Sequence, residues 1–232
     1  PDNTVELYDV NGKPIEKKEV SGDISAKQVI EDYIKALGGR ENLKQIESLQ
    51  QTGKTNVQGR NIEITIYQEK PDKYAMEMKM NGQLFMKQAF DGEKGKIVMM
   101  GNERNLSDEQ LDNMKKEAKV HKFLRYDELG IKTNLQGIET VNGQDAYKIE
   151  VVYPDSTKQF DFYSVDSGLK IRSRKKQQTP QGEITTTEDY SDYREVKGFM
   201  VPYKIDISGM QSMTMDIQEV KLNEEISEEV FQ

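Results

Sequence analysis

Residues 74–90 read Tyr-Ala-Met-Glu-Met-Lys-Met-Asn-Gly-Gln-Leu-Phe-Met-Lys-Gln-Ala-Phe, and this stretch decides the fold class. Large apolar side chains occupy every second position over 74–80, and charged side chains separate the methionines. Side chains of a β-strand point alternately to its two faces, so the pattern predicts a strand with one apolar face. Asn-Gly at 81–82 is typical of a two-residue hairpin turn, so we expect residues 84–90 to return antiparallel to this strand.

The same alternation and the same turns recur along the chain. Isoleucine stands at every second position over 62–66, and Asn142-Gly143 separates two further alternating stretches. Residues 199–207 and 213–222 form the last pair, joined through Gly209. Strands that follow one another through short turns pair antiparallel, whereas parallel strands need long crossovers. The sequence therefore predicts a mainly β protein of the α+β type, with an antiparallel sheet of about eleven strands.

Two segments carry the signals of a helix start. Residues 25–28 and 107–110 both have Ser at the first position and Gln three residues later, which is the spacing of a capping box. We expect the first helix to stop at Gly38-Gly39 and the second to fade near Leu124. Two helices are too few to cover about eleven strands. A long sheet also curls, so we expect its concave side to keep an apolar cavity.

The composition narrows the possible partners. The chain has 232 residues, 34% hydrophobic and 32% charged, with a formal net charge of −8. No apolar stretch approaches the 18 residues of a membrane-spanning helix. An acidic chain is a poor partner for nucleic acid, which attracts clustered Lys and Arg. The densest basic cluster, over 170–176, alternates along a predicted strand. We interpret it as a solvated sheet face, and a contact with an anion or a lipid headgroup stays open.

The domain organisation follows from the same patterns. Residues 1–22 contain Asn11-Gly12 and are expected to be a linker or a small hairpin outside the main sheet. Residues 23–232 are expected to form one domain. The chain begins with Pro1 and shows no signal peptide, so we interpret it as a mature form or an excised domain.

The residues that usually support catalysis are scarce. Cysteine is absent from the sequence, and His121 is the single histidine, which excludes thiol chemistry and the common zinc patterns. We expect His121 to be exposed or to cap a helix. Asp189 and Asp192 are three residues apart, and we interpret them as the end of a strand and its turn. The sequence predicts no catalytic residue, no metal site and no cofactor.

The methionines are the strongest indication of function. All eleven follow residue 75, and many fall on predicted apolar strand faces. Methionine is flexible and polarisable, and it is frequent on surfaces that accept varied apolar partners. The alternative is that these residues simply fill a core. The residues expected to line an apolar trough are Tyr74, Met76, Met78, Met80, Met86, Met213, Met215 and Ile217.

Two strand-turn segments resemble a known family. They are Tyr163-Ser164-Val165-Asp166-Ser167-Gly168-Leu169-Lys170 and the stretch from Asp189-Tyr190-Ser191-Asp192-Tyr193 to Gly198-Phe199-Met200-Val201-Pro202. Together with the order of helix, glycine pair, strands, helix and strands, they resemble the LolA/LolB-type lipoprotein carriers of Gram-negative envelopes, over about residues 25–231. The chain also resembles the carboxy-terminal tail domain of some pitrilysin/insulinase-type zinc peptidase-like envelope proteins.

The resemblance implies an unclosed β-barrel with helices across its concave face, and acyl chains held between the sheet and the helices. It also implies a periplasmic or cell-envelope location, and possible attachment to a peptidase module in the same polypeptide. The carriers use a strand arginine to hold their helical lid closed. No such arginine can be matched here, because Arg60 stands at a turn and Arg172 and Arg174 fall on an expected outer face.

Three functions remain in order of preference. The first is a non-catalytic domain that binds a lipid, a lipoprotein acyl chain or another apolar ligand. The second is an interaction domain with a filled core, appended to a peptidase-like protein. The third is an enzyme of a type that the sequence does not identify. The expected partners are thus an apolar ligand or lipoprotein, without nucleic acid.

Overall fold

The computed structural model describes residues 24–179, 182–210 and 212–232. These residues form two compact units. Unit 1 contains the described residues up to Ala36 together with Tyr126–Asp189, and unit 2 contains Leu37–Arg125 and Tyr190–Gln232. The linker or hairpin predicted for 1–22 lies outside the described residues, and the assignment of 23–232 to one domain stays a prediction.

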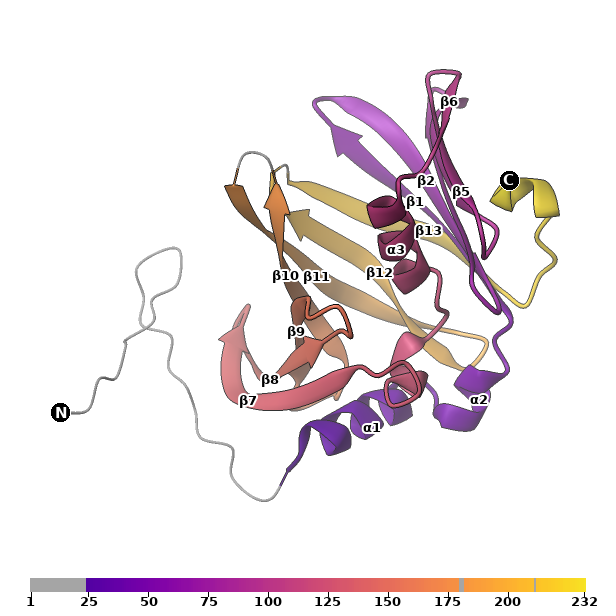
Figure 1. Cartoon of the computed structure of the whole chain (residues 1–232). Coiled ribbons are helices and arrows are strands. Elements are labelled where there is room, and N and C mark those ends of the chain that lie inside the picture. The colour runs from indigo at the N-terminus through magenta and orange to yellow at the C-terminus, as the bar shows by residue number, and fades with distance from the viewer. Residues whose placement is uncertain (1–23, 180–181, 211) are drawn as a thin grey trace. The chain divides into compact units, whose positions relative to one another are not determined.

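Strands make up most of the described chain, with short helices between them (Figure 1). The helices are α1 (Ala26–Ala36), α2 (Arg40–Lys44) and α3 (Asp108–Glu117), and the 3₁₀ turns are η1 (Lys122–Arg125) and η2 (Glu228–Phe231). The first strands are β1 (Ser48–Val57), β2 (Arg60–Glu69), β3 (Lys73–Met80), β4 (Gln83–Phe90), β5 (Gly95–Met99) and β6 (Asn102–Asn105). The others are β7 (Lys132–Val141), β8 (Gln144–Val152), β9 (Lys158–Ser164), β10 (Lys170–Thr179), β11 (Gly182–Val196), β12 (Phe199–Ser208) and β13 (Met213–Leu222).

The strands follow one hydrogen-bonded order, β6-β5-β4-β3-β2-β1-β13-β12-β11-β10-β9-β8-β7. Only β1 and β13 are neighbours without being consecutive in sequence, and the pairs of β1 with β13 and β2, and of β2 with β3, are antiparallel. Among the described residues, β6 and β7 end this order, so the sheet does not close. The predicted class, a mainly β protein with an unclosed antiparallel sheet and helices, is confirmed, with thirteen strands in place of about eleven.

The hairpin turns confirm the turn chemistry of the sequence. Asn81 and Gly82 have φ of 53° and 77°, and Asn142 and Gly143 have φ of 50° and 83°. Positive φ at both central residues is the requirement of the type I′ turn, whose twist suits a hairpin. The resulting register places Met76 opposite Ile66 and Met78 opposite Ile64.

In unit 1, α1 packs on one face of the sheet. The Tyr33 ring of α1 lies 5.0 Å from the Tyr163 ring of β9, between centroids. Gly168 has a φ of 72°, and a Cβ at this position would lie 3.5 Å from the Ala36 Cβ, so α1 lies close to the β9–β10 turn. Phe162 directly precedes Tyr163, so its side chain points to the other face of the strand, where it is fully buried. There Lys148 and Arg174 stack on its ring.

In unit 2, different segments pack on the two faces of β3 and β4. Phe90 packs with Met114 and Ala118 at α3, joined by Tyr74 and Met86. Ala89, one residue before Phe90, packs with Ala75 and with Phe231 of η2 on the other face. Side chains alternate across a strand, so α3 and η2 cover opposite faces of this sheet. Among the described residues, no helix is both long and apolar enough to cross a membrane.

Local details of both helix predictions need correction. At α3 the capping box is complete, because the Ser107 side chain accepts from the Gln110 backbone and the Gln110 side chain accepts from the Ser107 backbone. At α1 only half of the box forms, since the Gln28 side chain donates to Asp32. Helix α3 also ends at Glu117 and does not continue to 124, since a helix cannot include the positive φ of residue 121.

Candidate functional site

The eight residues predicted to line an apolar trough share one face of the unit 2 sheet. Alternation along β3 and β13 and the pairing of Met86 with Met78 place them together. Cross-strand partners point to the same face, so the register adds apolar residues of β2 and β12. We call the whole set the methionine face: Tyr74, Met76, Met78, Met80, Met86, Met213, Met215, Ile217, Ile62, Ile64, Ile66, Tyr203 and Ile205.

Two packed groups divide the methionine face. Tyr74 and Met86 belong to the group beneath α3. Met76 and Met78 belong to a second group, centred on Ile64, whose members all come from strands. Met80 and Met213 lie near hairpin ends and belong to neither group. The structure thus brings four of the predicted residues, Met76, Met78, Met215 and Ile217, into one cluster.

Burial varies across the second group. Ile64, Met215 and Ile217 are only 2–4% exposed and behave as core. Met76 and Met78 are half-buried, as are Ile62 and Ile66 beside them. Half-buried apolar side chains on one face lose water contact when a further apolar group covers them, which is the property that a ligand site needs.

The side chain of Met215 lies across the middle of this face. A Cβ added to Gly53 would lie 2.9 Å from Met215 Cε and 3.0 Å from Met215 Cγ, so any larger residue here would force the methionine side chain to move. Thr55 is on the same face, since it pairs with Ile62. Its Oγ1 is buried and has no hydrogen-bond partner among the described residues. A ligand that carries a hydrogen-bonding oxygen could satisfy this hydroxyl.

Sequence reasoning missed several residues of this site. The β12 residues Tyr203 and Ile205 alternate visibly, but only the β12–β13 register shows that they flank Met215. Gly53 and Thr55 give no sequence signal at all, because their roles depend on the β1–β13 pairing of distant segments.

A cation stands beside the methionine face. The Arg194 guanidinium of β11 stacks 4.4 Å from the centroid of the Tyr203 ring. Asp192 holds it with two hydrogen bonds, Nε–Oδ1 of 3.1 Å and Nη2–Oδ2 of 2.6 Å. This ion pair lowers the pKa of Asp192. The interpretation of 189–192 as a strand end was wrong, because both aspartates lie inside the longest strand, and Asp192 takes a φ of 52° there.

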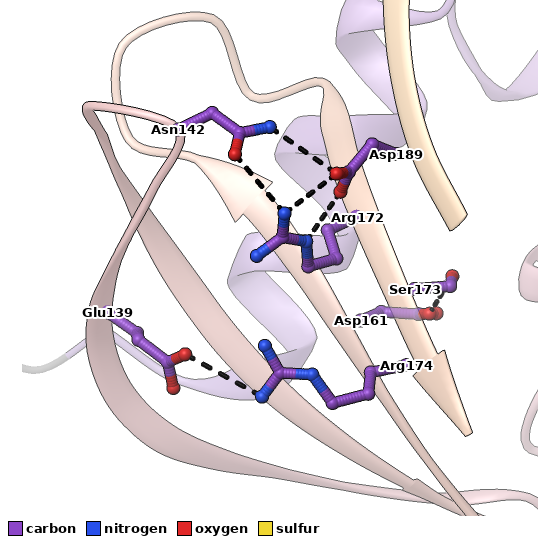
Figure 2. Close-up of polar contacts among 7 residues, drawn as sticks. All are labelled: Glu139, Asn142, Asp161, Arg172, Ser173, Arg174 and Asp189. Carbon is purple, nitrogen blue, oxygen red and sulfur yellow. Dashed lines mark hydrogen bonds and ion pairs between the residues drawn. The ribbon is translucent and has the colours of Figure 1, made fainter. Parts of the chain in front are cut away.

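The basic cluster of β10 is an ion-paired surface except at Lys170, which lies on the Tyr163 side beneath α1, so the interpretation as a solvated face was wrong for this residue. Arg172 donates two hydrogen bonds to Asp189, of 2.5 and 2.7 Å, and one to Asn142 (Figure 2). Arg174 lies 3.8 Å from Glu139. Both arginines pair across β9 with Phe162 and Phe160, on the face opposite Tyr163 and α1. The expected outer-face position of Arg172 and Arg174 is therefore confirmed, and their charges are largely compensated.

A buried polar cluster lies beneath α1 in unit 1. Asp161 is 1% exposed and accepts hydrogen bonds from Ser173 Oγ at 2.5 Å and from Gln159 Nε2 at 2.6 Å (Figure 2 shows the first). Burial lowers the pKa of Lys170, but the Asp161 charge and other acidic groups raise it above its ordinary value overall. Burial also raises the pKa of Tyr163 well above 10.0. At neutral pH Lys170 therefore stays charged and Tyr163 stays neutral, so these groups are suited to holding the fold.

His121 is not exposed, which corrects the first of the two expectations for it, and it stands directly before η1, where its backbone carbonyl accepts from the Leu124 backbone. Its Nε2 is buried and has no hydrogen-bond partner among the described residues. Its ring stacks near Phe123, with centroids 5.5 Å apart. Burial, and to a smaller extent the charge of Lys70, lower the pKa of His121 to about 4. Among the described residues, no group of three or more His, Asp or Glu side chains is placed to hold a metal ion.

The lowered pKa of His121 predicts a loss of stability in acid. Above pH 6.5 the ring is neutral in both states, whereas between pH 6.5 and about 4 only the unfolded chain binds the proton. The free energy of unfolding should therefore fall by up to about 3 kcal/mol over that window. We expect His121→Asn, which tolerates the positive φ, to flatten this part of the profile in urea titrations. An unchanged slope would contradict the burial of the ring.

Comparison with solved structures identifies the fold. A LolA superfamily protein from Nitrosomonas europaea matches with a TM-score of 0.61 and 12% identity, over 90% of this chain and 98% of that chain. A putative outer membrane lipoprotein-sorting protein domain from Vibrio parahaemolyticus matches with a TM-score of 0.58 and 11% identity, over 89% and 97%. No protein-family model matches the chain, and no curated protein matches it in sequence. The chain therefore has a LolA-like fold, as the resemblance implied.

Proposed function

We propose that unit 2 binds an apolar ligand, a lipid or the acyl chain of a lipoprotein, on the methionine face without catalysing a reaction. The observation that carries the proposal is the set of half-buried methionines and isoleucines that distant strands align on one side of the sheet. One similar structure is described as a lipoprotein-sorting protein domain, which agrees with this function and with a place in the periplasm or cell envelope.

The number of ligand methylenes that become buried sets the expected affinity. Burial of about ten methylenes at ~0.8 kcal/mol each gives ~8 kcal/mol before ordering costs, which corresponds to micromolar binding. Thr55 Oγ1 adds a preference for ligands with an ester, carboxyl or hydroxyl group, since its hydrogen-bonding capacity is unused.

One observation favours a second function, an interaction domain with a filled core. Ile64, Met215 and Ile217 are already buried without a ligand, so part of the methionine face is core. The solved structures reported above are not described as peptidase domains, so attachment to a peptidase module rests on the sequence resemblance alone.

The test is a titration of the delipidated protein with a fluorescent long-chain fatty acid, followed by competition with an unlabelled one. Saturable, competed binding is expected. An interaction domain with a filled core would show no saturable signal at any concentration below probe aggregation, and the binding function would then be withdrawn.

A further inference from the structure

Unit 2 has two opposite rims made of hairpin ends, and their chemistry differs. β1 and β3 end, and β4 and β13 begin, at one rim, because Ile62 pairs with Met80, Met86 with Met99 and Lys54 with Asp216. The β1–β2, β3–β4, β5–β6 and β12–β13 turns therefore share this rim. We call it the apolar rim; its four segments are residues 57–60, 80–84, 99–102 and the described residues of 208–213, which leave out residue 211.

Exposed apolar side chains gather at the apolar rim. Among the described residues, the large hydrophobic side chains that are exposed are Leu84 at 44%, Met99 at 50%, Met100 at 78%, Met210 at 75% and Val165 at 38%. All of these except Val165 lie on the apolar rim. Single exposed apolar residues are ordinary, but a gathering of them at one edge marks a contact surface.

Charge separates the two rims as clearly as hydrophobicity does. The four segments of the apolar rim contain no Asp or Glu, and Arg60 is their only charged residue, in a chain with 41 acidic residues. The opposite rim includes the turns 69–73 and 91–94, which read Glu-Lys-Pro-Asp-Lys and Asp-Gly-Glu-Lys. A region free of carboxylates lets a chain of net charge −8 approach an anionic surface with less electrostatic repulsion.

The apolar rim is also continuous with the methionine face. Met80 and Met213 are members of both, and Met99 pairs with Met86, which lies on that face. The exposed side chains project from separate hairpin ends, which suits shallow insertion between lipid headgroups. A protein partner more commonly needs a contiguous, close-packed patch with a polar border.

We propose that the apolar rim docks on a lipid surface, with Met100 and Met210 inserted at the boundary between headgroups and acyl chains. This proposal rests on the proposed function for its purpose, since docking there would bring the methionine face next to membrane lipid. Its physical basis is separate, namely the exposure of the rim methionines and the absence of acidic residues around them.

The chain contains no tryptophan, so a single introduced Trp reports on its own position. Met100→Trp and Met210→Trp are placed on the apolar rim, and Lys94→Trp is the matched exposed control on the opposite rim. With vesicles of phosphatidylcholine, with or without phosphatidylglycerol, we expect the rim tryptophans to shift to shorter emission wavelength. Brominated lipid should quench them, and the control tryptophan should show neither effect.

A second variant tests the need for the rim. Met100→Glu combined with Met210→Glu should lower co-flotation with these vesicles by at least tenfold, because each insertion would bury a carboxylate. Both positions are highly exposed, so the fold is expected to be retained, and circular dichroism checks it. The proposal is overturned if this variant co-floats with vesicles as well as the unmodified protein does. Equal responses at all three tryptophans overturn it too. So does silence of the rim tryptophans, which would point to a protein partner.

The two proposals fail separately. The rim variant should bind the fluorescent fatty acid in solution as the unmodified protein does, because neither position belongs to the methionine face. Vesicle binding without fatty-acid binding would remove the proposed function and leave the rim proposal standing. Fatty-acid binding without vesicle binding would remove the rim proposal alone.

Discussion

Replacement of Met76 and Met78 together by Glu is expected to abolish binding of the fluorescent fatty acid. Both side chains are half-buried on the same face of β3, and each contacts the cluster around Ile64. A carboxylate at either position would have to be desolvated beside an acyl chain without a partner, at a cost of several kcal/mol. Affinity should therefore fall by more than about a hundredfold.

The control for this variant adds the same two charges elsewhere in unit 2. Gln45→Glu with Gln218→Glu changes two exposed side chains outside the methionine face and nearly preserves their shape. We expect this control to bind the fatty acid like the unmodified protein. Urea unfolding distinguishes a ligand site from a filled core. If the Met76 and Met78 variant unfolds and the native protein does not bind the probe, these methionines are core. The interaction-domain alternative then holds.

Asp161→Asn is expected to cause the largest loss of stability in unit 1. Asp161 is buried, accepts hydrogen bonds from Ser173 and Gln159, and raises the pKa of Lys170 through its charge. The amide keeps the volume but removes the negative charge from a buried cation. Breaking one side of a buried charge pair costs about 3–5 kcal/mol. Equilibrium urea unfolding measures this loss directly.

Asp189→Asn is the matched comparison. Asp189 also pairs with an arginine, but on the partly exposed outer face, with side-chain exposures of 17% for Arg172 and 24% for Asp189. Solvent screens such a pair, so the expected cost is about 1 kcal/mol. Equal losses for the two aspartate variants would show that Asp161 does not stabilise a buried cation.

The strand pattern was predictable because it is local. Alternation at 62–66 and 74–80 and the Asn-Gly turns specify each hairpin within a few residues, and the structure confirms them. The end of α3 and the continuation of β11 through residues 189–192 were not predictable in this way. Each region contains a residue with positive φ, His121 after the end of α3 and Asp192 within β11, and this conformation is uncommon for residues other than glycine.

The candidate site was predictable only in part for a related reason. The alternating methionines of β3 predict an apolar face from the sequence alone. The structure places all eight predicted residues on one side of the sheet. Gly53, Thr55 and Tyr203 join them through the β1–β13–β12 pairing, which links segments about 160 residues apart and leaves no local trace. The burial of His121 was missed because the charged residues around it in the sequence do not indicate that other segments bury its ring.

The most direct test of the central claim is nuclear magnetic resonance of the protein with ¹³C-labelled methionine methyl groups, titrated with an unlabelled long-chain fatty acid. Met76 and Met78 lie on the methionine face, whereas Met200 precedes Val201 and Tyr203 on β12 and points to the opposite side by alternation. The account predicts saturable shifts of the Met76 and Met78 methyl signals while the Met200 signal stays in place. Shifts confined to Met200, or no saturable shift of Met76 and Met78 at a concentration that saturates the fluorescent probe, would contradict it.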